Sequence, residues 1–302
     1  MIISAIIVTF NPDMKLLLQQ YKSVCSQVNY VVYVDNGSSN FYEYKKAIEE
    51  ITLVSNDIRF IRNDYNMGLG YAHNQGIKIA KELKAQSVLI LDHDSVLRPK
   101  FVNSLLLAMK RLLAEGVKLA AVGPVYINEK TKEQYPITRY WGPFIKRLKP
   151  TKQLVEASVL ISSGTLIPIN ILDVVGGMDE NLFVDYIDIE WSYRVRSMGY
   201  KLYVVPSAIM NHQIGDKRIS VFGRIVSMHS PLRRYYLSRN SIYMLKCPYI
   251  SLGYKLREFT FNIFRIIIFT LYSNDKSKYL KYSFRGIIDG IKGHYGKSSL
   301  LV

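Results

Sequence analysis

The chain has 302 residues, of which 49% are apolar, and carries 40 Lys and Arg against 24 Asp and Glu, a net charge of +16. A chain of this length and apolar content can bury a large core, which excludes a disordered protein. Its two cysteines, Cys25 and Cys247, lie far apart in the sequence. Neither a disulfide framework nor a zinc site is therefore indicated, and we expect a reducing, cytosolic compartment.

The positive charge is concentrated in the C-terminal part of the chain. Residues 1 to 216 hold 24 Lys and Arg against 21 Asp and Glu, a balance of +3. Residues 217 to 302 hold 16 Lys and Arg against three acids, a balance of +13. The basic character therefore belongs to the C-terminal segment.

The first 120 residues alternate between strand and helix patterns. Residues 2 to 9 are apolar without a preceding basic region, which is typical of a first core strand and not of a signal peptide. Further strands are expected at 30–34, 58–62, 87–91 and 119–124, and helices at 14–26, 42–51, 70–84 and 100–115. Repeated β-α units of this kind predict an α/β fold with a mostly parallel central sheet flanked by helices.

The rest of the chain is less regular. We expect an exposed polar excursion at 128–152, apolar β-type sequence at 154–168, a short helix at 171–175, a helix at 183–198 and a strand at 201–205. Everything after Ser220 is expected to form a helical appendage.

The apolar run at residues 87–91 stops abruptly at Asp92-His93-Asp94-Ser95. Such a run is typical of a parallel strand covered on both faces, and ligands of open α/β sheets bind outside the carboxyl ends of these strands. Because side chains alternate along an extended chain, Asp92 and Asp94 would point the same way. Two hard oxygen ligands suit Mg²⁺ or Mn²⁺ bridging a diphosphate, but a loop with two solvated acids explains these residues equally well.

Two more loops fall at the ends of expected strands, Thr9-Phe10-Asn11-Pro12 and Asp35-Asn36-Gly37-Ser38. An Asp just past a strand can accept a hydrogen bond from a pyrimidine imide, and Thr9 can flank the same base. Each loop alone is also typical of an ordinary turn, because Asn-Gly is a strong turn signal. Their convergence with Asp92 favours a nucleotide site.

The stretch from Asn66 to Gly76 opens a helix with glycines that permit close approach of a phosphate or nucleoside. It is not a dinucleotide fingerprint, because His73 occupies the position of the third glycine. A phosphate loop of the Gly-x-x-x-x-Gly-Lys type does not occur either, which disfavours a nucleoside triphosphatase.

Acidic residues gather between Gly176 and Arg194, at the start of the helix expected there. The helix dipole favours negative charge at this place, and a carboxylate facing a cleft could accept a proton from an attacking hydroxyl. The spacing of Asp188 and Glu190 puts them on different helical faces. A solvated acidic cluster remains the alternative.

His212 follows the strand at 201–205 in a loop, where it could be a metal ligand or an ordinary hydrogen-bonded histidine.

The C-terminal segment contains a strongly apolar and aromatic stretch at residues 259–272, interrupted by Arg265. It is too short to span a bilayer, which needs about 20 apolar residues. A basic, aromatic-rich helical segment of this kind is typical of a helix lying on an anionic membrane surface. Nucleic acid could use the same charge, but the segment has no recognition motif. A buried helix with solvated basic flanks is the other alternative.

With these motifs in this order, residues 3 to 245 resemble the inverting family 2 glycosyltransferases of the GT-A fold, and most closely the bacterial rhamnosyltransferases. The resemblance implies a catalytic base at Asp188, with possible support from Glu190, Asp185 and Arg194. Many relatives have Glu-Asp where this chain has Ile187-Asp188. The remaining implied residues are nucleotide-sugar contacts at Thr9, Phe10, Asn11, Asp35, Asn36, Asn66, Gly68, Asn74, Asp92 and His93, and metal ligands at Asp94, Asp92 and His212.

The resemblance also implies a division of the chain and a biological setting. A GT-A catalytic domain would cover residues 1–220, with a nucleotide-sugar half at about 1–95 and an acceptor half at about 96–220. A basic helical segment, 221–302, would associate with membrane. The block from Ser230 to Tyr236, followed by Arg239-Asn240, resembles the rhamnosyl subgroup.

The implied donor is dTDP-β-L-rhamnose, used with Mg²⁺ or Mn²⁺, and the implied acceptor is a polyprenyl-diphosphate-linked saccharide of O-antigen or capsule. The implied place is the cytoplasmic face of the bacterial inner membrane, with no nucleic-acid partner. Another sugar, such as galactofuranose from UDP, stays open, as does a non-catalytic saccharide- or membrane-binding module. A nucleotidyltransferase would need a basic triphosphate loop near the N-terminus, and residues 9 to 14 contain no Lys or Arg.

Overall fold

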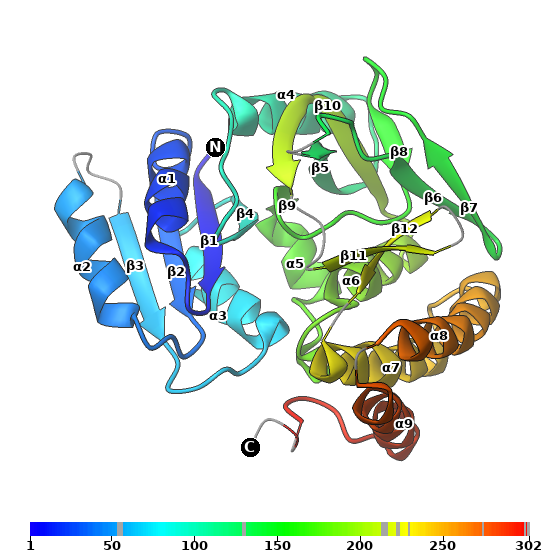
Figure 1. Cartoon of the computed structure of the whole chain (residues 1–302). Helices are drawn as coiled ribbons and strands as arrows, with labels where there is room; N and C mark the ends of the chain where they lie inside the picture. Colours follow the sequence, from blue (N-terminus) through cyan, green and yellow to red (C-terminus); the bar gives the residue numbers. More distant parts are fainter. Residues whose placement is uncertain are drawn as a thin grey trace.

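The computed structural model describes residues 1–52, 57–128, 131–212, 217–221, 224–228, 230–273, 275–298 and 300, with the backbone alone at 212, 217–221 and 224–228. An eight-stranded sheet in the order β3-β2-β1-β4-β9-β5-β10-β8 forms the centre of the molecule, with helices on both sides (Figure 1). The mostly parallel α/β fold expected from the sequence is confirmed.

The first half of the sheet is fully parallel and follows the predicted alternation. Its strands are β1 (Ile3–Thr9), β2 (Tyr30–Asp35), β3 (Asp57–Arg62) and β4 (Ser87–Asp92), separated by α1 (Met14–Val24), α2 (Phe41–Ile51) and α3 (Leu69–Glu82). In the register of the sheet, Thr9 pairs with Asp35 on one side, and its neighbour Val8 pairs with Asp92 on the other. The three strand-end loops therefore meet at one edge.

The second half of the sheet is mixed. Helix α4 (Phe101–Ala114) leads to β5 (Leu119–Asn128), which pairs in parallel with β10 (Lys201–His212). Strand β9 (Thr165–Pro168) is inserted antiparallel between β4 and β5, and β8 (Val155–Ala157) forms an antiparallel edge. The apolar sequence at 154–168 was expected to be β-type throughout. It forms strands only at its two ends, because Gly164, with a φ of +85°, turns the chain just before β9.

Two hydrophobic layers cover the sheet. One face packs against α1, α2 and α4 through residues such as Leu17, Tyr44 and Phe101. The other packs against α3, α5 (Ile169–Val175) and α6 (Ile187–Ser197) through residues such as Ile77 and Trp191. The carboxyl edge of the parallel strands is left for loops.

Two expectations about local structure were wrong, those for 183–198 and for the residues after Ser220, and the exposed excursion at 128–152 proved more ordered than expected. The helix expected at 183–198 begins only at Ile187, after a short 3₁₀ turn at Glu180–Leu182, because Phe183, Asp185 and Tyr186 have positive φ angles. The excursion at 128–152 contains a β-hairpin, β6 (Ile137–Trp141) and β7 (Phe144–Leu148). A second hairpin, β11 (Lys217–Val221) and β12 (Arg224–Met228), precedes the C-terminal helices.

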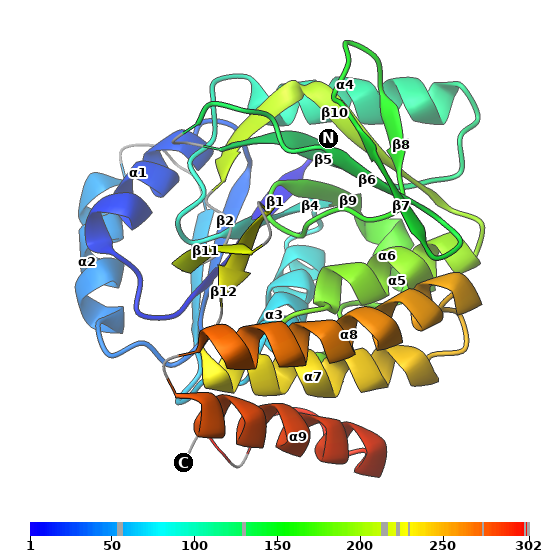
Figure 2. The same cartoon turned by 45° about the vertical axis from the view of Figure 1, so that its right-hand side comes forward.

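The C-terminal helices α7 (Pro231–Lys246), α8 (Leu252–Tyr272) and α9 (Lys276–Lys292) pack on one another beneath the sheet (Figure 2). Helix α9 approaches α7 closely at Gly286 and Gly290, where an added Cβ would collide with the carbonyl oxygens of Tyr235 and Arg239. Among the described helices, none is long and apolar enough to cross a membrane.

We predict that Gly286→Ala destabilises the fold by about 1–3 kcal/mol, because the added methyl group overpacks the α7–α9 contact. Alanine is the better helix former, so the propensity effect alone would be stabilising. Urea unfolding of this variant, with Lys281→Ala on the exposed side of α9 as the matched control, measures the difference. A Gly286→Ala variant as stable as the wild type would contradict the close contact.

Candidate active site

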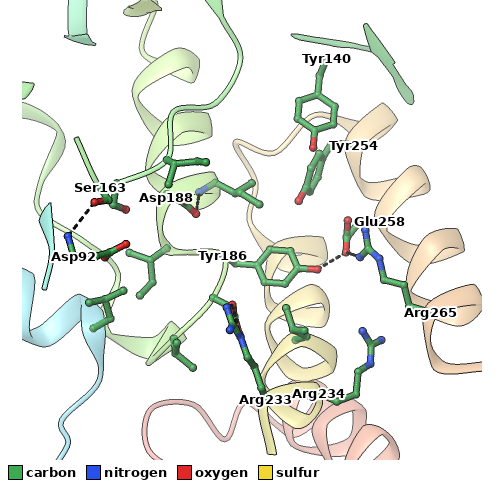
Figure 3. A pocket seen from close by; sticks show the side chains of 18 of the residues that line it. Asp92, Tyr140, Ser163, Tyr186, Asp188, Arg233, Arg234, Tyr254, Glu258 and Arg265 are labelled. Carbon is green, nitrogen blue, oxygen red and sulfur yellow. Dashed lines mark hydrogen bonds and ion pairs between the residues drawn. The ribbon is translucent and has the colours of Figure 1, made fainter. Parts of the chain in front are cut away.

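A cavity of about 620 Å³ lies between the end of β4, the start of α6 and the helices α7 and α8 (Figure 3). Its wall combines acids, arginines and tyrosines from distant parts of the chain. The labelled lining residues are Asp92, Tyr140, Ser163, Tyr186, Asp188, Arg233, Arg234, Tyr254, Glu258 and Arg265. A second cavity, of about 790 Å³, shares Tyr140 and Asp188 with the first. Asp188 therefore stands where the two cavities meet.

Asp92 is the last residue of β4 and is followed at once by a turn, in which the Ser95 N–H donates to the Asp92 carbonyl over 3.1 Å. The strand alternation used to orient Asp92 and Asp94 therefore ends at Asp92. The Asp92 N–H donates to Ser163 Oγ over 2.9 Å. Burial, reinforced by the charge of Asp94, raises the pKa of Asp92 to about 6.

The donor set at this turn fits a divalent cation. Asp92 is partly buried and Asp94 is exposed, and their charges repel each other. A hard cation would relieve this repulsion, and Mg²⁺ or Mn²⁺ binds through one or two carboxylates while leaving positions open for substrate phosphates. The described side chains contain no group of three or more His, Cys, Asp or Glu able to hold a metal. His212, which was expected in a loop after a strand at 201–205, is instead the last residue of β10, and its side chain lies outside the described residues.

Hydrogen bonds to Asp35 connect the end of β1 to the loop after β2. Its buried carboxylate accepts hydrogen bonds from the Thr9 and Tyr44 hydroxyls and from the backbone N–H groups of Gly37 and Ser38. These contacts fix the loop that follows β2. Asn11 joins the same loop: its N–H donates to Ser38 and its side chain accepts from Ser39, while Phe10 is exposed.

An amide network ties the end of β2 to the start of α3. Asn36 donates to Asn66 Oδ1 over 3.0 Å and to the Gly68 carbonyl over 3.2 Å, and the Gly68 N–H donates to Asn66 Oδ1. Asn74, which lies within α3, does not take part in this network. It donates to the Met178 carbonyl over 2.9 Å and accepts from the Met178 N–H over 2.8 Å. In this structure Asn74 anchors the turn after α5.

Asp188 is the second residue of α6 and lines the cavity, where its carboxylate accepts the Ile189 N–H over 2.9 Å. Burial raises the pKa of Asp188 to about 6, and the charges of Asp185 and Asp92 add to this effect. Asp188 and Asp92 therefore influence each other electrostatically across the cavity.

Glu190 and Arg194 lie on the other side of α6 and are absent from the cavity wall as described. Glu190 is fully buried and pairs with Arg194 over 2.8 Å, and it also accepts from Tyr249. Arg194 in turn donates to the carbonyls of Val175 and Gly177. This pair connects α6 to the turn after α5 and to the loop after α7, which is a structural task.

The loop before α6 is held by α7, which the sequence patterns did not anticipate. The Asn240 amide donates to the carbonyls of Leu182, Val184 and Asp185 at 2.9, 2.7 and 3.2 Å. Arg239 donates to the carbonyls of Asn181 and Leu182 at 3.1 and 2.9 Å. Positive-φ residues other than glycine cost about 1–3 kcal/mol each, and three of them occur in this loop. Hydrogen bonds from α7 stabilise this unfavourable backbone.

Two charge pairs complete the wall. Arg233 of α7 binds Asp185 with both Nε and Nη2, the shortest contact being 2.9 Å. On α8, Glu258 is buried and accepts from the Tyr186 hydroxyl and from Arg265, the latter over 2.6 Å. Sequence reasoning missed Glu258 and Arg265. The available signal was a lone carboxylate within an otherwise apolar and basic helix.

The model of the family described as "Glycosyl transferase family 2" matches residues 4–175 of the chain. The chain belongs to this family. It is 33% identical over 298 residues to a protein of Shigella flexneri described as dTDP-rhamnosyl transferase RfbF, covering 97% of both chains. It is 23% identical to the low-salt glycan biosynthesis hexosyltransferase Agl10 of Haloferax volcanii, covering 96% of this chain and 94% of that one. The expectation of a family 2 glycosyltransferase is confirmed.

Solved structures support the fold. This family 2 chain aligns with GalNAc-T7 bound to UDP, GalNAc and Mn²⁺, with a TM-score of 0.60 and 19% identity, over 97% of the chain but only 58% of that structure. It aligns with the mannosyltransferase PcManGT of Pyrobaculum calidifontis, bound to GDP-Man and Mn²⁺, with a TM-score of 0.57 and 13% identity, over 96% of this chain and 75% of that one. The GT-A fold expected from the sequence is thereby confirmed.

We predict that Asn240→Leu lowers the stability of the protein by about 1–3 kcal/mol or more. Asn240 is buried, and the substitution leaves three backbone carbonyls without the donor that they share. Asn103→Leu, at an exposed position of α4, serves as the control and should change stability little. Thermal unfolding of the two variants measures the difference. Equal melting temperatures would show that α7 does not stabilise the loop.

Proposed function

We propose that this glycosyltransferase transfers L-rhamnose from dTDP-β-L-rhamnose to a hydroxyl group of a saccharide acceptor, with inversion at the anomeric carbon. The observation that carries the proposal is that Asp92, at the strand-end nucleotide loops, and Asp188, at the start of α6, line one cavity. The identity to the Shigella flexneri protein supports the choice of donor, and inversion is general in family 2.

The donor would lie at the carboxyl edge of the parallel strands. Side chains and backbone groups of the loops after β1 and β2 and at the start of α3 would hold the nucleotide. Asp94 and Asp92, with His212, would hold Mg²⁺ or Mn²⁺, which when bound neutralises charge on the diphosphate leaving group. The proposed nucleotide-sugar contacts are Thr9, Phe10, Asn11, Asp35, Asn36, Asn66, Gly68 and His93. Asn74 is not among them, because its amide binds the Met178 backbone and positions the turn after α5.

Asp188 would act as the catalytic base. Its carboxylate takes the proton of the acceptor hydroxyl as the hydroxyl oxygen forms a bond to the anomeric carbon, and the bond from that carbon to the diphosphate oxygen breaks, releasing dTDP. A base works best when its pKa lies close to the working pH, and a pKa of about 6 meets that requirement. Arg233 forms an ion pair with Asp185 and neutralises its charge. Among the described contacts near the start of α6, Asp188 accepts only the Ile189 N–H and has no cationic partner.

The acceptor would be a saccharide carried on polyprenyl diphosphate, as the family resemblance implies. We propose that residues 221–302 bring the enzyme to the anionic cytoplasmic face of the bacterial inner membrane. Exposed apolar side chains occur along α8, at Phe259, Ile263 and Ile267, and along α9, at Phe284 and Ile291. Together with the net charge of +11 that residues 221–302 carry (14 Lys and Arg against three acids), they would provide the surface that an anionic membrane binds.

We predict that Asp188→Asn lowers kcat by about 10²–10⁴, because asparagine cannot accept the proton. Binding of dTDP-rhamnose, measured by calorimetry, should stay near that of the wild type. In the wild type, kcat/KM measured at saturating Mn²⁺ should fall as the pH drops through about 6, since the protonated carboxyl is inactive as a base. Residual activity of Asp188→Asn should lack this step. The exposed Asp173→Asn variant is the control, and near-normal turnover by Asp188→Asn would refute the assignment.

We predict that only dTDP-rhamnose, from a panel with UDP-galactofuranose, UDP-N-acetylglucosamine and GDP-mannose, supports metal-dependent nucleotide release. EDTA should abolish the reaction, and Asp94→Ala should lose the part of donor binding that depends on Mn²⁺. Asp173→Ala, which also removes one exposed negative charge, should behave as the wild type. Turnover with another donor would contradict the assignment of rhamnose as the transferred sugar. Donor binding by the wild type that does not depend on metal would contradict the assignment of Asp94 as a metal ligand.

A further inference from the structure

Two segments far apart in the sequence meet at one corner of the molecule, the tip of the β6–β7 hairpin and the first turn of α8. Gly253 packs directly on the backbone of Gly142 and Pro143, so closely that an added Cβ would collide with both. The same corner can be followed in Figure 1, where the hairpin lies beside one end of α8. This contact brings the side chains next to the glycines together.

These neighbouring side chains are large, apolar and exposed. Leu252 is 81% exposed and Trp141 is 78% exposed, the two highest values among the large apolar side chains described, and Phe144 and Leu256 beside them are 65% and 60% exposed. The rings of Trp141 and Phe144 stack with their centroids 6.3 Å apart. We name these four residues the apolar corner. Contiguous exposed apolar side chains of this kind mark a surface that binds a partner.

The apolar corner continues into α8. Phe259, Ile263 and Ile267 are exposed and follow Leu252 and Leu256 at spacings of three and four residues, which keeps them on one helical face. Helix α8 has 21 residues, so this face is about 30 Å long. The partner surface is therefore extended and broadly apolar, as a membrane interface is.

The β6–β7 hairpin, which carries Trp141 and Phe144, bears charge of one sign. Residues 134–155 contain five Lys and Arg and no acid, with exposed side chains at Arg139, Lys146, Arg147 and Lys149 along the hairpin and just after it. A second copy of this chain would bring the same positive charge against itself, which opposes self-association. An anionic lipid surface is complementary to it, at about 1 kcal/mol per basic residue near the surface.

We infer that the apolar corner inserts into the interfacial layer of an anionic bilayer, with Trp141 at headgroup level and the basic residues of the hairpin on the lipid headgroups. This inference deepens the proposed function, which puts the acceptor in a membrane. It adds the β6–β7 hairpin, which lies outside the C-terminal segment, as a second point of attachment. Two points of attachment fix the orientation of the enzyme on the membrane.

The orientation serves the active site. Tyr254 and Glu258 lie on α8 between the exposed positions and line the cavity. A helix with its side chains is about 10–12 Å across, so insertion of the outer face holds the cavity about that far from the headgroups. A saccharide attached to a membrane-bound diphosphate can reach across such a distance.

Trp141 is a natural reporter for this inference. The chain has two tryptophans, and Trp191 is buried in the core, so Trp141 is the one that can meet lipid. The full-length protein is mixed with vesicles of phosphatidylglycerol and phosphatidylcholine whose acyl chains are brominated, and with vesicles of phosphatidylcholine alone. We expect a blue shift and quenching of Trp141 emission with the anionic vesicles. Trp141→Phe should still bind them but show no quenching, because only Trp191 remains.

A second measurement quantifies the contribution of the corner. Trp141→Ser combined with Phe144→Ser should weaken vesicle partitioning by about tenfold or more, because it removes the apolar area that would be buried. Calorimetric binding of dTDP should be unchanged. Tyr42→Ser, which removes an exposed aromatic residue on α2 instead, should bind vesicles as the wild type does.

Three outcomes would overturn the inference. Unquenched Trp141 emission from vesicle-bound protein would place the corner in water. Unchanged partitioning of the double variant would remove its contribution. A dimer in sedimentation that the double variant abolishes, without vesicle binding, would make a second copy the partner. These outcomes leave donor turnover untouched, whereas a failed donor panel with normal vesicle binding would refute the proposed function alone.

Discussion

The geometry of the cavity depends on the hydrogen bonds that Asn240 and Arg239 donate to the loop before α6. Phe183, Asp185 and Tyr186 hold backbone conformations that residues with a side chain avoid, and α7 supplies the donors that stabilise them. This loop aims Asp188 into the cavity and presents Asp185 to Arg233. The C-terminal helices are thus part of the site, because Tyr254 and Glu258 of α8 also belong to its wall.

The electrostatics of the cavity follow from an imbalance of partners. Asp185 is matched by Arg233 and Glu258 by Arg265, so both pairs are internally neutral. Asp92 and Asp188 have no such cation among the described contacts, and burial makes their charged forms costly, which is why the pKa of each rises to about 6. The two carboxylates suit different parts of the proposed reaction. Asp92 would face a cation with a diphosphate, and Asp188 would face the proton of the acceptor hydroxyl.

Sequence patterns predicted the parallel half of the fold because its determinants are local. An apolar run ending in polar residues defines a strand and its loop, and parallel pairing then brings Thr9, Asp35 and Asp92 to one edge. The determinants of the acid loop are distant. Nothing near Phe183 indicates a positive φ, since the donors to the adjacent Leu182 and Val184 carbonyls lie in α7. Likewise, Glu258 meets Tyr186 across 72 residues. The packing of Gly253 against Gly142 and Pro143 is of the same kind, because it joins segments more than 100 residues apart.

In the membrane-bound state proposed above, helix α8 would serve two surroundings with its two faces. Its buried residues, Tyr254, Glu258 and Asn262, each meet specific partners, Asn262 through Arg234 and Ser241, whereas its exposed face requires only apolar character. Substitutions on the outer face therefore need to conserve hydrophobicity alone. A change of length has a larger effect, because inserting one residue rotates all that follows by about 100° and turns the buried residues away from their partners. The outer face of α8 can therefore exchange one apolar residue for another, whereas its buried contacts constrain the length of the helix.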